Sequence, residues 1–243
     1  MTTTTRNRIA AIAAASLAIM AAAPIRAQSL VQRVNAVREG TVRMSMATRA
    51  DVCGYGTTIV HGPNTRTSWG DSRDGSRRNR DLEWDVECTS GPLRIVLEKS
   101  DGEVVAVRHY IGGRWRENAN ATDLGTVPAR EGAEFLVSLA ERSSGKASRD
   151  AIFPATLADS ATVWPQLIRI ARNDERPRAT RQQAIFWLGQ MVGDRLTDSL
   201  SAIATDGEEE REVRKQAVFA LSQRHRDEGV PALIRIARTN KDP

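Results

Sequence analysis

The feature that most constrains this chain is a repeat of 33 residues in its C-terminal half. Leu167 recurs at this spacing as Leu200 and again as Leu233. The segment 181–190 also aligns with 214–223 at the same spacing, without a gap. Two separate segments that share one period indicate an array of structural repeats.

Each unit predicts two short amphipathic helices. Trp164 and Leu167 lie on one face of the first helix, and Ala184 and Leu188 lie on one face of the second. Between them, Pro177 ends the first helix because proline cannot continue it. Neither helix is long enough to be stable alone, so the pairs must bury their apolar faces against one another as an α-solenoid.

The second helix carries the pattern E-V-R-x-x-A-x-x-A-L at residues 212–221. This pattern resembles the HEAT repeat in its compact bacterial form, and the resemblance extends from about residue 128 to 243. The first copy departs from it, because Thr180 stands where the next copy has Val213. The signature sequences of ankyrin and tetratricopeptide repeats are absent. The resemblance implies a helical scaffold that presents its second helices to a protein or peptide partner.

A degenerate copy is predicted before the two clear ones. Residues 135–140 resemble 166–171, and residues 151–153 match 184–186. Terminal repeats are often atypical because they cap the array. The sequence stops after a helix of the first type, so we expect a HEAT-like solenoid over 125–243 that is incomplete at its C-terminal end.

Residues 1–27 have the composition of a secretory signal peptide. Arg6 and Arg8 precede an apolar run over 9–23, and Ala27 ends a predicted cleavage site. The run is shorter than the roughly 20 residues that span a bilayer, although an uncleaved anchor is the alternative. We therefore expect an exported protein, periplasmic or secreted in a bacterium, with no stable membrane anchor after cleavage.

Removal of the leader changes the charge of the protein. The whole chain carries a net charge of +5, and the leader contains three arginines and no acidic residue, which leaves +2. A nearly neutral mature protein gives no electrostatic reason to expect nucleic acid as a partner.

The chain has two cysteines, Cys53 and Cys88. An exported protein with an even number of cysteines favours a disulfide. Closing a loop of about 36 residues stabilises a fold by roughly 4 kcal/mol in the chain-entropy account. The alternatives are a Cys53 nucleophile with His61 as its base, which lacks a visible orienting group, and a zinc site, which lacks the usual ligand spacing.

Residues 28–124 predict a small antiparallel β domain with a short helix at its start, which makes the whole chain an α+β protein. Ser29 and Gln32 fit the capping box of that helix. Apolar and polar residues alternate over 42–46, and a strand over 93–98 leads through Asp101-Gly102, a hairpin signal, into 103–111. The last of these strands is apolar on both faces, so we expect it to be central.

Three repeated positions of the second helices are candidate binding residues, together with a loop in the β domain. Phenylalanine recurs at the first position, where we favour rings that pack between repeats over rings that bind a partner. Glutamine recurs at the second position, and arginine recurs at the third, where we favour bonds to neighbouring turns. The candidates are Phe153, Phe186, Phe219, Gln190, Gln223, Arg181 and Arg214 in the helices, and Arg73, Arg77, Arg78 and Arg80 in a loop that either binds anions or is simply solvated.

No catalytic motif, glycine-rich phosphate loop or metal-ligand spacing is visible, and no cofactor is implied. We therefore predict a non-catalytic, exported scaffold that binds a protein or peptide through its solenoid surface. The alternative is a ligand- or glycan-binding module in the β domain, with the solenoid as a spacer.

Overall fold

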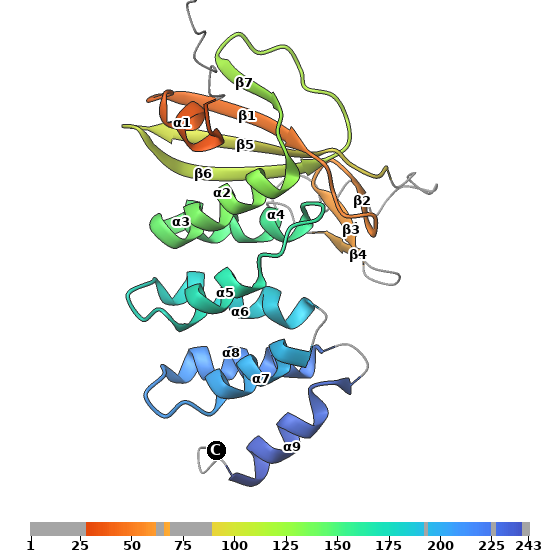
Figure 1. The fold of residues 1–243 in the computed structure, drawn as a ribbon, viewed down its shortest axis with the longest axis vertical. Coiled ribbons are helices and arrows are strands. Elements are labelled where there is room, and N and C mark those ends of the chain that lie inside the picture. The colour runs from red at the N-terminus through yellow and green to blue at the C-terminus, as the bar shows by residue number, and fades with distance from the viewer. Residues whose placement is uncertain (1–27, 62–65, 69–88, 192–193, 225–226, 240–243) are drawn as a thin grey trace, which may run out of the picture.

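The computed structural model describes residues 28–61, 66–68, 89–191, 194–224 and 227–239. In this part of the chain a β-rich region lies at one end of a stack of helices (Figure 1). The predicted α+β class, with a helical array after the sheet, is confirmed. The leader 1–27 lies outside the described residues, so its role stays a prediction.

Four strands form the main sheet, in the order β6–β5–β1–β7. β1 (Gly40–Met46) pairs antiparallel with β5 (Leu93–Ser100), and β5 pairs antiparallel with β6 (Glu103–Ile111). β7 (Ala121–Thr126) runs parallel to β1 at the other edge. The prediction of an antiparallel sheet is therefore wrong for β7, because residues 112–120 cross from one edge of the sheet to the other instead of turning back beside β6.

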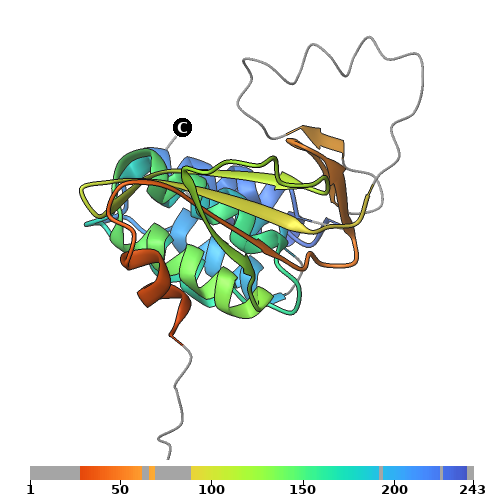
Figure 2. The same ribbon diagram turned by 90° about the horizontal axis from the view of Figure 1, so that it is seen from above.

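Side chains alternate between the two faces of the main sheet. Val42 and Met44 on β1 are buried, whereas Thr41 and Arg43 are partly exposed on the opposite face. Seen from above, the sheet lies over the helices, and its apolar face packs on them (Figure 2). The outer face therefore carries the polar side chains.

The turn between β5 and β6 follows its sequence signal. Asp101 has φ 54° and Gly102 has φ 83°, so both residues adopt the left-handed conformation that a two-residue hairpin favours. Ser100 and Glu103 pair on either side of the turn. The predicted hairpin is confirmed.

A second, smaller sheet extends from the main one. β2 (Val52–Tyr55), β3 (Thr58–His61) and β4 (Arg66–Ser68) pair antiparallel in chain order. Cys53 lies on β2. Its predicted partner, Cys88, lies outside the described residues, so the pairing stays a prediction.

The short helix α1 (Leu30–Asn35) has the predicted capping box. The Ser29 hydroxyl accepts a hydrogen bond from the Gln32 amide at 3.3 Å, and the Gln32 side chain accepts one from the Ser29 amide at 3.0 Å. The Leu30 amide donates to the carboxylate of Glu131 at 2.8 Å. This bond joins the start of α1 to α2.

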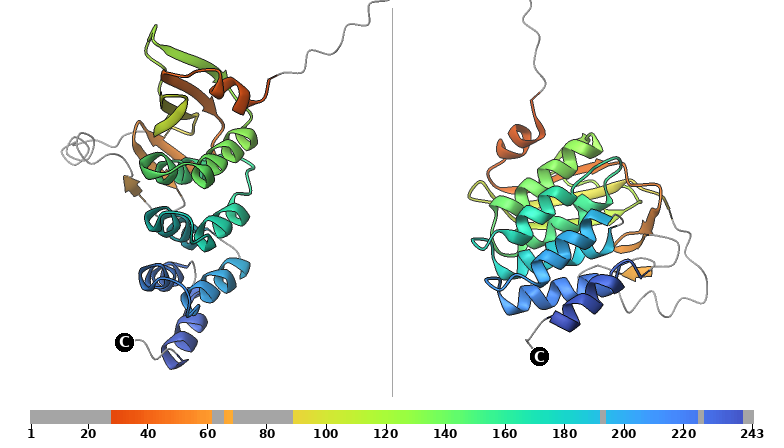
Figure 3. Two further views of the ribbon diagram at one scale, coloured as in Figure 1. Left: turned by 90° about the vertical axis from the view of Figure 1, so that its left-hand side faces the viewer. Right: turned by 60° about the horizontal axis from the view of Figure 1, so that its bottom comes forward.

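The remaining helices pair into stacked hairpins (Figure 3). Pro128 and Pro177 occupy the N-cap positions of α2 and α6, so each proline lies where the helix needs no amide from it. The hairpins are α2 (Ala129–Arg142) with α3 (Gly145–Asp150) and α4 (Ile152–Leu157), α5 (Trp164–Arg172) with α6 (Arg178–Gln190), and α7 (Asp194–Ala204) with α8 (Arg211–Ser222), and they are followed by α9 (Val230–Thr239).

The first hairpin is the degenerate copy predicted from the sequence. Its second helix is divided at Ala151 into α3 and α4. Pro154 stands in the first turn of α4, where a missing amide leaves no helical hydrogen bond unmade. This hairpin packs between the sheet and α6, so it joins the β region to the array.

The sheet and the helices share one continuous apolar core. β7 spans the boundary predicted between residues 124 and 125, and Val127 directly after it is buried. Gly132 on α2 lies so close to Met46 on β1 that an added Cβ would come within 2.5 Å of the methionine Cε. Within the described residues, no helix is both long and apolar enough to span a membrane.

Candidate functional site

The three repeated phenylalanines lie on α4, α6 and α8, and their exposure increases along the array. Phe153 is 4% exposed, Phe186 is half-buried and Phe219 is 48% exposed. The same position in the repeat therefore has three different environments. Only the last ring is largely available to a partner.

The first two rings take part in an aromatic cluster inside the molecule. Phe153 stacks on Trp187, with ring centroids 4.2 Å apart and planes 12° apart. The edge of His109 on β6 meets Phe153 at 5.0 Å, and Phe186 meets Trp187 edge-on at 5.1 Å. Phe153 therefore packs between the sheet and the next repeat, which is the packing role favoured for the repeated phenylalanines.

Glutamines flank the phenylalanine on both α6 and α8. Their spacing of i, i+3 and i+7 places each set of three on one helix face. We refer to these two sets as the glutamine–phenylalanine stripe, which consists of Gln183, Phe186 and Gln190 on α6, and of Gln216 and Phe219 on α8 with Gln223 at its C-cap. Each member of the stripe is half-buried or exposed.

The stripe on α8 is more open than that on α6. Gln190 is half-buried, whereas Gln223 is exposed and its side-chain amide donates to the Ser222 hydroxyl at 3.3 Å. The sequence identified Gln190 and Gln223 but missed Gln183 and Gln216. The same 33-residue spacing would have identified this second pair.

The two repeated arginines bond to the turn between α7 and α8. Arg181 is 1% exposed, and its guanidinium donates to the Ala171 carbonyl at 3.0 Å and pairs with the Glu209 carboxylate. Arg214 is half-buried and donates to the Glu209 carbonyl at 2.6 Å. Arg181 thus contributes to the packing of one repeat on the next and is not accessible to a partner.

The arginine loop predicted to bind anions, with Arg73, Arg77, Arg78 and Arg80, lies outside the described residues. Its binding role stays a prediction. Among the described residues, no group of three or more histidine, cysteine, aspartate or glutamate side chains is arranged to hold a metal ion.

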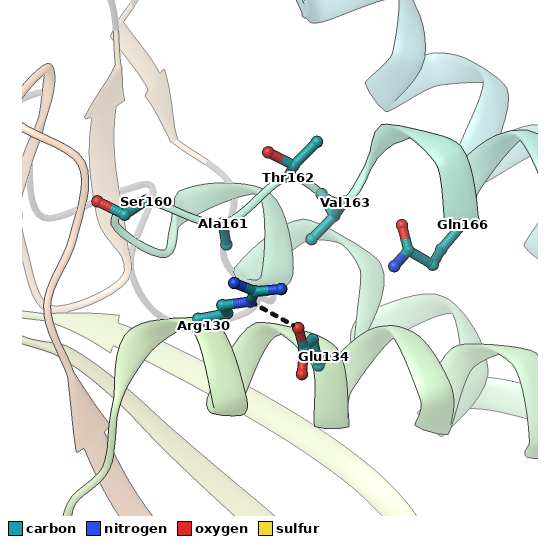
Figure 4. Close-up of a pocket in the computed structure, with 7 residues that line it drawn as sticks. All are labelled: Arg130, Glu134, Ser160, Ala161, Thr162, Val163 and Gln166. Carbon is teal, nitrogen blue, oxygen red and sulfur yellow. Dashed lines mark hydrogen bonds and ion pairs between the residues drawn. The ribbon is translucent and has the colours of Figure 1, made fainter.

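A small hollow lies between α2 and the start of α5 (Figure 4). Its volume is about 200 Å³, and one wall is the ion pair between Arg130 and Glu134 at 2.9 Å. Gln166 points its side chain toward this space, and its Oε1 is buried without a hydrogen-bond partner. The lining also contains the hydroxyls of Ser160 and Thr162, and its one carboxylate, that of Glu134, is paired with Arg130.

The comparison of the sequence with known families agrees with the stacked helical hairpins in the C-terminal part of the chain. The family model described as HEAT repeats matches residues 164–243. Residues 164–243 are HEAT repeats. This segment covers α5 to α9, and therefore includes both halves of the glutamine–phenylalanine stripe. No curated protein and no solved structure matches the chain.

The HEAT repeats place the stripe on successive second helices. α6 packs against α8, and the two helices approach closely at Gly189, where an added Cβ would lie 2.8 Å from the Ala220 Cβ. This contact fixes the spacing between the two halves of the stripe.

Proposed function

We propose that this chain is an exported, non-catalytic scaffold whose glutamine–phenylalanine stripe binds a protein or peptide partner. HEAT repeats form helical scaffolds that often mediate protein interactions. The observation that carries the proposal is Phe219, a large ring that is 48% exposed at the centre of the stripe on α8.

The chemistry of the stripe suits a polypeptide. An exposed aromatic ring supplies apolar area at the centre of an interface. The glutamine amides beside it each offer donors and an acceptor, which are the groups that a peptide backbone requires. Lys215, at the edge of the stripe, is 3.2 Å from Glu212, so opposite charges lie side by side there.

Export is part of the proposal. The apolar leader 1–27 supports it, and the net charge of +2 after cleavage supports a partner other than nucleic acid. Sequencing the N terminus of the protein recovered from the periplasm or medium of the producing bacterium tests this step. Export with cleavage after Ala27 predicts a first residue of Gln28, and a chain that keeps Met1 and stays with the membrane contradicts it.

The binding step is tested by capture from an envelope extract with the full chain, tagged at its C terminus. Phe219→Asp places a charge at the centre of the stripe. Val105→Asp is the matched control, because Val105 is an exposed apolar residue on β6, 49% exposed and outside the array. Substitutions suit this test better than separate halves of the chain, because a cut at residue 124 would divide β7.

The proposal predicts a specific protein that the unmodified chain and the Val105→Asp variant capture equally, and that Phe219→Asp loses. Capture that is unaffected by Phe219→Asp, or that is lost only with Val105→Asp, would contradict binding at the stripe. The circular dichroism spectra of both variants should match that of the unmodified chain, because both residues are largely exposed.

A further inference from the structure

A second surface of the molecule has the chemistry of a binding site, and it lies on the outer face of the main sheet. Figure 2 looks down on this face, where residues 112–120 cross from β6 toward β7. The crossing segment and the strands enclose a groove of about 750 Å³. Arginines and aromatic residues from β1, β5, β6 and the crossing segment line it.

Arg94 is held in a fixed position at the base of the groove. Its Nε donates to the Gly112 carbonyl at 2.8 Å, its Nη2 to the Gly113 carbonyl at 2.5 Å, and its Nη1 to the Ser45 hydroxyl at 3.1 Å. A guanidinium that is already fixed loses little conformational entropy when a ligand binds. Three bonds also leave two of its five N–H groups for another acceptor.

Trp115 completes this arrangement. The Arg94 guanidinium carbon lies 5.0 Å from the centroid of the Trp115 ring, and that of Arg43 lies 5.3 Å from it. Both distances are within the range of a cation–π interaction. The indole thus positions two positive charges from neighbouring strands beside one another.

Positive charge in the groove exceeds the carboxylates that pair with it. Five arginines line the groove: Arg43, Arg94, Arg108, Arg114 and Arg116. Asp123 pairs with Arg43 at 2.9 Å, and Glu98 pairs with Arg108 at 2.8 Å. Within the described residues the other three arginines form no ion pair, and Glu117, which follows Arg116, does not line the groove. The groove therefore carries unneutralised positive charge.

The pKa of the Arg94 guanidinium is consistent with unneutralised positive charge in the groove. Desolvation by burial lowers that pKa below its ordinary value, Asp123 opposes the shift, and the charge of Arg43 adds to it. The charged form of Arg94 is therefore less favourable here than in water. An anion in the groove would relieve this cost.

We propose that this groove binds an oxyanion, carried by a sugar-sized ligand that lies against its aromatic rings. Arg94, Arg114 and Arg116 supply the unpaired guanidinium groups, which bind carboxylate, sulfate and phosphate through paired hydrogen bonds. Tyr55, Tyr110 and Trp115 line the same groove and offer flat faces with polar edges. The site is separate from the HEAT repeats and does not depend on the function proposed for them.

Isothermal titration calorimetry of the full chain at low salt tests the proposal with four probes. Tetragalacturonate presents carboxylates, a heparin-derived tetrasaccharide presents sulfates, and fructose 1,6-bisphosphate presents phosphates. Maltotetraose is the neutral control. The double variant Arg114→Gln/Arg116→Gln removes two exposed guanidinium groups for which the structure records no side-chain hydrogen bond, so it should fold normally. Arg235→Gln/Arg238→Gln removes the same charge from exposed positions on α9.

We expect saturable binding of at least one anionic probe and none of maltotetraose. The preferred probe identifies which oxyanion the groove recognises. Arg114→Gln/Arg116→Gln should weaken that binding by about tenfold or more, which corresponds to about 1.4 kcal/mol, and the α9 pair should leave it within about twofold. The proposal is overturned if no anionic probe binds, or if both double variants weaken binding equally.

Discussion

Ser148 and Arg181 occupy the same position in successive repeats, and each donates a hydrogen bond to the equivalent backbone carbonyl of its own hairpin. The Ser148 hydroxyl donates to Ala140 O at 2.9 Å, and Arg181 Nε donates to Ala171 O at 3.0 Å. Ser148 also lies 3.0 Å from the Thr180 hydroxyl of the next hairpin. The longer arginine extends from this position to Glu209, in the turn of the hairpin that follows.

Arg181→Met should destabilise the array strongly. The side chains of Arg181 and Glu209 are 1% and 10% exposed, so removal of the arginine leaves a buried carboxylate without its ion-pair partner. Breaking one side of a buried pair costs about 3–5 kcal/mol. The double variant Arg181→Met/Glu209→Gln should recover part of this loss, because it removes the stranded charge. Urea unfolding followed by circular dichroism measures both effects, and strict additivity of the two single changes would contradict the predicted coupling.

The phenylalanine positions should respond to truncation in the order of their burial. Phe153→Ala removes a ring that stacks on Trp187 and should lower the free energy of unfolding by about 3–5 kcal/mol. Phe219→Ala should change it by no more than about 0.5 kcal/mol, because that ring is largely exposed. Both values come from urea unfolding curves. A loss at Phe219 as large as that at Phe153 would show that the exposed ring also packs in the core.

Gly189→Ala should destabilise the array although alanine favours helix. The new Cβ would lie 2.8 Å from the Ala220 Cβ and 3.0 Å from its carbonyl oxygen, so α6 and α8 would have to separate. Overpacking of this kind costs about 1–3 kcal/mol, against a helix-propensity gain of about 1 kcal/mol. Thermal unfolding of Gly189→Ala beside Gly132→Ala is the measurement. Gly132→Ala should be milder, because its added Cβ would clash with the flexible end of Met46 and make only an ordinary contact with Val127, and the reverse order would contradict the packing.

The contribution of Lys99 to the free energy of unfolding should increase as the pH rises above neutrality. Its side chain is buried and donates to the Val34 carbonyl at 3.0 Å. Desolvation lowers its pKa below the ordinary value of 10.5, while Glu103 opposes this shift and Arg38 adds to it. The unfolded chain therefore binds this proton more tightly than the folded protein does. The charged Lys99 thus lowers the free energy of unfolding at neutral pH, and this loss disappears as the pH rises toward 10.5.

The comparison with Lys99→Met isolates this effect. The free energy of unfolding of the unmodified protein, minus that of Lys99→Met, should increase as the pH is raised from about 7 to about 10. Urea unfolding at several pH values gives this difference directly. A difference that stays constant, or that decreases with pH, contradicts the prediction.

Local signals in the sequence predicted local structure well. The capping box of Ser29 and Gln32 and the turn at Asp101-Gly102 both depend on neighbouring residues, and both are present. The period of 33 residues also predicted the hairpins, because each hairpin is one repeat of the pattern.

Features that depend on distant segments were not predictable in this way. The expectation that 103–111 is central is wrong, because β6 is an edge strand of the main sheet and its inner face is covered by α3. No sequence rule placed β7 beside β1, or brought Trp115 over Arg43 and Arg94. The three phenylalanines occupy equivalent positions in the sequence, and the structure distinguishes them by their burial and by the stacking of Phe153 on Trp187.

The most direct test of the scaffold proposal is photocrosslinking in the producing cell. The photoreactive amino acid p-benzoylphenylalanine replaces Phe219 in the full chain, or replaces Val105, which is 49% exposed on β6, as the control. We predict that irradiation joins one specific protein to the chain with the label at position 219 and not to the chain with the label at position 105. The same adduct from both positions, or no adduct from position 219, would contradict a partner bound at the glutamine–phenylalanine stripe.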